Sequence, residues 1–167
     1  ETLTVTTNFL KKLAIEYGRT QPTYVLPNYI DLETYKFDFN KRKKADKKIK
    51  IVYQGSTTHY TDIVKSGIVE AAKMLIEKYG KTVKFVFVGM VPEGFEDAIP
   101  KGRCDYIDGK SDFYEWVELW KNKMGDFDIA IAPLNHSDFN YGKSEIKFYE
   151  ASACKLPFVG SNTPNYQ

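Results

Sequence analysis

The chain has 167 residues, of which 43% are hydrophobic and 28% are charged, and its formal net charge is +2. This length is enough for one ordinary domain with a hydrophobic core, and the composition is that of a globular protein. No apolar run approaches the roughly 20 residues of a membrane-spanning helix, which argues against an integral membrane protein.

The first 36 residues predict a small β-α-β unit. Residues 2–6 have strand character, residues 8–17 have helix character, and residues 24–26 predict a second strand. One such unit cannot bury its own apolar faces. The sequence also begins without Met and inside a predicted strand. We therefore expect an excised piece of a longer protein, with residues 1–36 as the remnant of an N-terminal domain.

A strongly basic segment follows this unit. Residues 41–48 read KRKKADKK, whereas the rest of the chain is mildly acidic. We interpret residues 37–48 as a solvated linker, because a nucleic-acid-binding domain spreads its basic charge over a face with interleaved aromatic residues. We therefore expect no nucleic-acid partner. The alternative is a contact with anionic lipid headgroups, which an enzyme at the cytoplasmic membrane surface could use.

From residue 49 onward the pattern alternates between strands and helices. The β-branched run at 49–53 predicts a strand that ends at Gly55. One helix with Gly80 at its C-cap should follow, and apolar residues three or four apart define its face: Val64, Ile68, Ala71, Leu75 and Tyr79. Further strands are predicted at 83–89, 104–107, 129–132 and 157–160.

Two more helices are predicted between these strands. One begins after Ser111 or Asp112, and its apolar face carries Phe113, Trp116, Val117 and Trp120. The other covers roughly 144–154 and follows a polar loop at 135–143. Repeated β-α-β units imply an α/β fold with a Rossmann-like parallel sheet covered on both faces. Ligands then bind at the carboxyl ends of the strands, in the loops after Gly55, Gly89, Ile107 and Pro133.

The strongest functional signal is the stretch 140–157. Ser144 is a plausible N-cap, so the amides at the start of this helix would be free to bind phosphate. Lys143, Lys147 and Glu150 are spaced four and three apart and share a helical face. The lysines could neutralise a diphosphate, and the carboxylate could accept hydrogen bonds from vicinal sugar hydroxyls. The alternative is a plain N-cap with a surface ion pair between Lys147 and Glu150.

This stretch resembles the donor-site segment of the family-4 retaining glycosyltransferases, which have the GT-B fold. Their signature has two glutamates separated by seven residues, and Glu150 with the following residues to Pro157 is similar to its second half. The first glutamate falls at Gly142 and is absent. A variant of the family writes this loop as Phe-Asn-x-x-Lys-Ser-x-x-Lys-x-x-Glu, which fits Phe139, Asn140, Lys143, Ser144, Lys147 and Glu150.

Two other segments resemble the same family in the right order. Gly55, Ser56, His59 and Asp62 fit a first loop of the form Gly-Ser-x-x-His-x-x-Asp, although many relatives carry an arginine directly after this glycine and a lysine further on. His59 either faces the sugar diphosphate or is an ordinary loop histidine. Residues 27–31, Pro-Asn-Tyr-Ile-Asp, resemble the segment that closes the family's N-terminal domain.

No metal site is expected. Cys104 and Cys154 form no ligand spacing with each other or with the two histidines, so a zinc site or a disulfide is not expected and a cytoplasmic location is the default. The DxD sequence at 126–128, which holds a metal-nucleotide in the other glycosyltransferase fold, leads directly into a predicted buried strand. We interpret it as the start of that strand.

The resemblance implies a transferase that moves a sugar from a nucleotide-diphosphate-sugar donor to a hydroxyl acceptor, such as a glycan or lipid-linked glycan in polysaccharide synthesis, with retention of configuration. Residues 49–167 would bind the donor and residues 1–36 would belong to the acceptor domain. Phosphates would contact Lys143, Ser144 and Lys147, the ribose Glu150, and the base the loops at Gly89 and Asp108. No catalytic residue or cofactor is assigned, and the fragment alone should be inactive. The alternative is a non-catalytic nucleotide-binding or protein-interaction domain.

Overall fold

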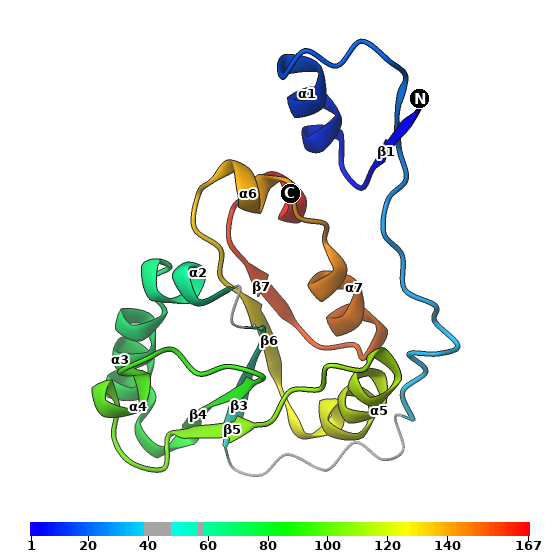
Figure 1. The fold of residues 1–167 in the computed structure, drawn as a ribbon. Coiled ribbons are helices and arrows are strands. Elements are labelled where there is room, and N and C mark those ends of the chain that lie inside the picture. Colours follow the sequence, from blue (N-terminus) through cyan, green and yellow to red (C-terminus); the bar gives the residue numbers. More distant parts are fainter. Residues whose placement is uncertain (39–47, 57–58) are drawn as a thin grey trace.

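The computed structural model describes residues 1–38, 48–56 and 59–167. These residues form two parallel sheets, one with two strands and one with five (Figure 1). The basic segment at 41–48 lies outside the described residues except for Lys48, so its predicted roles as linker or lipid contact stay predictions.

The N-terminal unit consists of β1 (Leu3–Val5), α1 (Asn8–Glu16) and β2 (Thr23–Val25). The two strands pair in parallel, as expected for a β-α-β unit. The Thr7 hydroxyl accepts a hydrogen bond from the Leu10 amide at 3.2 Å and so caps α1. Figure 1 shows this unit at one end of the molecule. The residues between β2 and β3, of which 26–38 and 48 are described, are called the connecting segment below.

The larger sheet has the strand order β5-β4-β3-β6-β7, and every neighbouring pair is parallel. Its strands are β3 (Ile49–Gln54), β4 (Val83–Val88), β5 (Cys104–Ile107), β6 (Ile129–Ala132) and β7 (Phe158–Gly160). The sequence-based prediction of five parallel strands is therefore confirmed. The order reverses between β3 and β6, which is the place where open α/β sheets bind ligands.

Alternate residues of β3 and β4 face opposite sides of the sheet, and each side has its own helical layer. On one side, Ile51, Tyr53, Phe85 and Phe87 pack against α2 (Tyr60–Lys65), α3 (Ile68–Tyr79) and α4 (Phe95–Ala98). Because successive apolar side chains of these strands point to opposite faces of the sheet, the protein has two separate cores rather than one.

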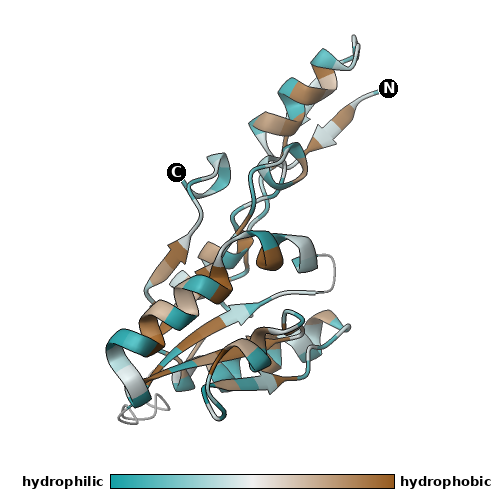
Figure 2. Cartoon of the chain, turned by 90° about the vertical axis from the view of Figure 1, so that its left-hand side faces the viewer, coloured by the Kyte–Doolittle hydropathy of each residue, from teal (hydrophilic) through white to brown (hydrophobic). Residues whose placement is uncertain are grey.

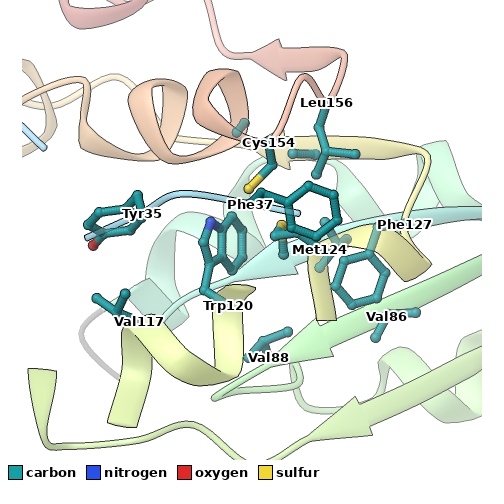
Figure 3. Packing of buried hydrophobic residues seen from close by; sticks show 13 residues of the cluster. Tyr35, Phe37, Val86, Val88, Val117, Trp120, Met124, Phe127, Cys154 and Leu156 are labelled. Carbon is teal, nitrogen blue, oxygen red and sulfur yellow. The ribbon is translucent and has the colours of Figure 1, made fainter. Parts of the chain in front are cut away.

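The second core lies between the sheet and α5 (Phe113–Lys123), with α7 (Ile146–Ala153) beside it. Val52, Val86 and Val88 contribute from the strands. Figure 3 shows Tyr35 and Phe37 of the connecting segment packed with Trp120 of α5 and with Cys154, which directly follows α7. The connecting segment is therefore part of the core of the larger sheet.

The predicted helix at 64–79 is wrong in one respect, because two helices occupy this region. The Ser66 hydroxyl donates to the Ile63 carbonyl at 2.9 Å, and Gly67 adopts a φ of 75°, so α2 ends and α3 begins in a new direction. The buried positions shift accordingly: Ile63 is buried and Val64 is 49% exposed. Gly80 follows α3 at its C-cap, as predicted, and begins the short helix η3 (Gly80–Thr82).

The predicted helix start at Ser144 is also wrong. A short helix, α6 (Asp138–Tyr141), lies within the predicted polar loop and is capped by the Ser137 hydroxyl. The next helix, α7, begins only at Ile146, after Glu145. Two further 3-10 turns complete the chain, η4 (Met124–Asp126) after α5 and η5 (Pro164–Tyr166) after β7.

In Figure 2 the strands of the larger sheet carry long brown, hydrophobic stretches, whereas the visible helices alternate between hydrophobic and hydrophilic residues along their length. Within the described ranges, none of the helices combines the length and the apolar character that crossing a bilayer requires.

Candidate functional site

A cavity of 740 Å³ opens at the carboxyl edge of the five-stranded sheet. Its walls come from the loops after β3, β4 and β5 and from the first turns of α5 and α7. Most of the residues that the sequence predicted for the site line it, namely Gly55, Ser56, His59, Gly89, Asp108, Lys147 and Glu150. Three of the four predicted loops, those after Gly55, Gly89 and Ile107, thus contribute to the cavity, whereas the loop after Pro133 does not line it.

Three glycines bring the loops after β3, β4 and β5 into direct contact. A Cβ on Gly89 would lie 2.6 Å from the Gly55 carbonyl oxygen, and one on Gly109 would lie 2.9 Å from the Gly89 Cα. Gly89 also adopts a φ of 90°, which side chains disfavour. Gly55 itself faces the Tyr53 ring, with which a Cβ would collide. These glycines therefore shape the floor of the cavity through contacts within the protein.

Glu150 is the only acidic group of α7, and its carboxylate is 4% exposed. Its Oε1 accepts from the Tyr35 hydroxyl at 3.0 Å and from the Trp116 indole at 3.4 Å, and its Oε2 accepts from the Gln54 amide. Burial raises the pKa of Glu150, and the three hydrogen bonds partly offset this shift. The alternative of an exposed surface ion pair with Lys147 is therefore wrong.

Lys147 lies one turn before Glu150 on the same helix. Its side chain lines the cavity, while its Nζ is shielded from solvent and has no hydrogen-bond partner among the described residues. The ammonium lies 4.8 Å from the centre of the Tyr53 ring. Burial, followed by the nearby charge of Lys143, lowers the pKa of Lys147 to about 8. An unpaired ammonium beside a cavity is a candidate site for an anion.

Lys143 and Asn140 do not line the cavity and instead contact a buried carboxylate, Asp62. The Lys143 Nζ lies 2.9 Å from the Asp62 Oδ2, and the Asn140 side-chain amide donates to the other oxygen. Burial raises the pKa of Asp62, but hydrogen bonds from Lys143 and Asn140 outweigh burial and lower it overall. Both residues thus join the α6 loop to α2 in this structure.

His59 connects this cluster to the cavity. Its Nδ1 lies 3.3 Å from the Asp62 carboxylate and 3.2 Å from the Lys143 Nζ. Burial, followed by the charges of Lys147 and Lys143, lowers the pKa of His59 to about 4. The ring is therefore neutral near pH 7.

Ser144 is the third predicted residue that does not line the cavity. Its hydroxyl accepts a hydrogen bond from the Asn28 side chain at 2.8 Å, so it contacts the connecting segment. Gly142 is packed nearby, and a Cβ there would lie 2.8 Å from the Leu10 side chain of α1. A second cavity, of 290 Å³, lies between the N-terminal unit and the α6 loop. This region is therefore the contact between the two units.

Several lining residues were not predicted from the sequence: Gln54, Tyr106, Gly109, Lys110, Ser111, Trp116 and Ile146. Trp116 was assigned to the core with Trp120, and the two rings do stack, with centroids 5.8 Å apart. The signal for Gln54 was present, because it is a polar residue at the carboxyl end of the central strand. No cluster of three or more potential metal ligands occurs within the described ranges.

The sequence matches no family model and no curated protein. Solved structures do match the fold. HepE from Anabaena, in complex with UDP and glucose, is 15% identical with a TM-score of 0.66, and the match covers 98% of this chain and 45% of HepE. Sucrose-phosphate synthase from Thermosynechococcus elongatus is 13% identical with a TM-score of 0.62, over 99% of this chain and 42% of the synthase.

A third match is the pneumococcal O-GlcNAc transferase GtfA in complex with UDP and GlcNAc. It is 13% identical with a TM-score of 0.56, over 98% of this chain and 30% of GtfA. The chain therefore spans less than half the length of each of these proteins. Since all three are GT-B glycosyltransferases, this chain has the α/β fold of part of a GT-B glycosyltransferase, with a five-stranded parallel sheet flanked by helices.

Proposed function

We propose that this chain carries the nucleotide-diphosphate-sugar site of a glycosyltransferase, and that the site is the cavity at the carboxyl edge of the five-stranded sheet. The observation that carries the proposal is the pair Lys147 and Glu150. An unpartnered ammonium and a buried carboxylate lie one helical turn apart at the same cavity. A diphosphate joined to a ribose needs such a pair of groups.

In this proposal Lys147 neutralises the diphosphate. Lysine has a flexible four-carbon stem, so its ammonium can move from the Tyr53 ring into the cavity when an anion enters. The neutral His59 ring, which lines the same wall, can donate or accept a hydrogen bond at the phosphate or sugar. Lys143 and Ser144, which the sequence suggested for the phosphates, contact Asp62 and Asn28 instead, so the proposed phosphate site does not contain them.

Glu150 would accept a hydrogen bond from a ribose hydroxyl, because an ionised carboxylate is a strong acceptor. The base would contact the loops after β4 and β5, near Gly89 and Asp108. HepE and GtfA were each solved in complex with UDP, which supports UDP as the first nucleotide to test. The resemblance to the family-4 enzymes supports retention of configuration and a hydroxyl acceptor such as a glycan.

The direct test is calorimetry with UDP, and in parallel with GDP, ADP and dTDP, in the presence and absence of EDTA. Lys147 supplies positive charge without a metal, so we expect weak binding of at least one nucleotide that EDTA does not change. A strict requirement for magnesium would instead favour a metal-nucleotide site at Asp126 and Asp128. Failure of all four nucleotides to bind would contradict the proposed function.

A non-catalytic nucleotide-binding domain is the second candidate. The observation in its favour is Gly142, which stands where the family's first glutamate would be and packs against Leu10. A Cβ at this position would lie 2.8 Å from the Leu10 side chain, so a glutamate there would require that side chain to move. Assays of sugar transfer by a longer form of the protein separate the two candidates, since both predict nucleotide binding. For residues 1–167 alone, which span less than half of each neighbour, we expect no transfer.

A further inference from the structure

The connecting segment between the two units contributes a side chain to the proposed nucleotide site. Tyr35 is 4% exposed and packs in the core beside α5 and α7, although it follows the N-terminal unit in the chain (Figure 3). Its hydroxyl donates to Glu150 across 115 positions of sequence. We propose that Tyr35 is a positioning residue, whose hydroxyl holds the Glu150 carboxylate in the orientation that a ribose requires. This inference rests on the proposed function.

The position of Tyr35 is fixed from its own side. The Asp31 carboxylate accepts hydrogen bonds from the Glu33 amide at 3.0 Å and from the Thr34 hydroxyl at 2.6 Å, and the Tyr35 amide donates to the Asp31 carbonyl at 2.9 Å. These bonds close a turn at residues 31–35. Phe37 is also buried in the core. The backbone at Tyr35 is therefore fixed on one side by the turn at 31–35 and on the other side by Phe37.

The existing hydrogen bonds leave little freedom to the carboxylate. An ionised carboxylate offers about four acceptor positions, and donors from Tyr35, Gln54 and Trp116 occupy three of them. Each donor comes from a different part of the fold: the connecting segment, β3 and α5. The carboxylate is thereby fixed in one orientation, with acceptor capacity left for a ligand in the cavity that Glu150 lines. A ribose that binds there also stabilises the contact between Glu150 and the connecting segment.

The hydroxyl also supports the charged form of Glu150. Burial raises the pKa of this carboxyl, whereas the hydrogen bond from Tyr35 lowers it. Lys147 is the cation that faces Glu150, and the neutral groups Cys154 and Tyr166 lie near it. Loss of the Tyr35 hydroxyl therefore raises the pKa of Glu150 further. If nucleotide binding needs the ionised carboxylate, a variant without this hydroxyl loses binding at a higher pH than the unaltered protein does when the solution is acidified.

The test is Tyr35→Phe, which keeps the ring and the core packing, with Tyr29→Phe as the matched control. Tyr29 lies in the same segment and is 77% exposed. The first measurement needs no ligand: the Glu150 carboxyl is titrated by carbon-13 NMR. We expect its midpoint to rise by about one pH unit in Tyr35→Phe and to stay unchanged in Tyr29→Phe.

The second measurement is UDP affinity between pH 5 and 8. We expect Tyr35→Phe to bind about tenfold more weakly at the acidic end, with a smaller difference at pH 8, and Tyr29→Phe to match the unaltered protein. An unshifted Glu150 titration, or equal affinities at every pH, would overturn the role of Tyr35. Absence of binding by the unaltered protein with UDP, GDP, ADP and dTDP overturns the proposed function instead, and the NMR titration distinguishes this result from a failure of the Tyr35 contact.

Discussion

At the scale of single residues, the site contains two buried charged groups that differ in their hydrogen bonding. Glu150 has three donors around its carboxylate, whereas the Lys147 ammonium has no hydrogen-bond partner among the described residues. A buried charge without a partner costs stability, and proteins retain such groups mainly at functional sites. The two residues therefore predict different outcomes when their charges are removed.

Lys147→Met should weaken UDP binding by about ten- to a hundredfold, the effect of losing one charge-assisted hydrogen bond. The melting temperature should stay the same or rise, because the variant removes an unpaired ammonium and keeps the apolar stem. Lys73→Met, at an exposed position of α3, is the control. A fall in stability with unchanged affinity would show that Lys147 is only structural.

The pH dependence of UDP affinity gives an independent check on Lys147. Its pKa of about 8 lies below that of free lysine, so the protein loses this positive charge as the pH rises through 8. Affinity should therefore fall between pH 7 and 9 in the unaltered protein. In Lys147→Met the curve should be flat over the same interval, and calorimetry at matched ionic strength measures both.

Glu150→Gln should weaken UDP binding by about tenfold or more, because the amide is a poorer acceptor for the ribose. Its effect on folding should be within about 1 kcal/mol. The Gln54 Oε1 has no partner among the described residues, so a rotation of the Gln54 amide gives the new NH2 group an acceptor. Glu150→Ala leaves two buried donors and one half-buried donor unpaired and should cost about 2–4 kcal/mol. Equal melting temperatures for the two variants would contradict this network.

At the scale of elements, the loops that follow three adjacent strands contact one another at glycine residues. The loops after β3, β4 and β5 approach so closely that a methyl group at Gly109 would lie 2.9 Å from the Gly89 Cα. The neighbour is backbone and cannot rotate away. The shape of the cavity therefore depends on how tightly these loops pack.

Gly109→Ala should displace the loop after β5, lower the free energy of unfolding by about 1–3 kcal/mol, and weaken UDP binding. Gly18→Ala is the comparison, because Gly18 has open space around it and only its φ of 85° opposes a side chain. Thermal unfolding and calorimetry on both variants provide the measurements. Unchanged nucleotide binding by Gly109→Ala would argue against a base site between these loops.

At the scale of the whole molecule, the N-terminal unit rests on the α6 loop. Phe9 and Tyr141 meet edge to face with centroids 5.6 Å apart, and Asn28 donates to Ser144. Gly142 receives the Leu10 side chain between these contacts. Position 142, where the family resemblance leads us to expect a glutamate, thus lies in the interface between the two units.

Gly142→Ala should destabilise this interface by about 1 kcal/mol or more, because its Cβ would overlap Leu10. In a Leu10→Ala background the added methyl group has room, so the same substitution should cost less. A double-mutant cycle of unfolding free energies measures the coupling, which we expect to exceed about 0.5 kcal/mol. Additive effects would mean that the units do not pack together through Gly142.

The local pattern of the sequence was sufficient for much of the fold. Short apolar runs, of which 49–53 is the β-branched one, predicted the five strands of the larger sheet, and parallel pairing followed from the helical segments between them. The spacing of Lys143, Lys147 and Glu150 predicted one shared helical face. Lys147 and Glu150 do lie on α7 and line the cavity, whereas Lys143 precedes the helix and does not line it. These features depend on the repeat of side-chain directions along a strand or a helix, and this repeat can be recognised within one segment of the sequence.

Only the tertiary structure determined which groups those side chains contact. Lys143 pairs with Asp62 from 81 positions away and Glu150 with Tyr35 from 115 positions away, and neither contact leaves a periodic signal. Ser144 does not cap α7, which begins at Ile146, and its hydroxyl instead accepts a hydrogen bond from Asn28 of the connecting segment. Long-range partners are set by how the layers of the fold pack against each other, and the free energy of that packing belongs to the whole chain rather than to any one segment.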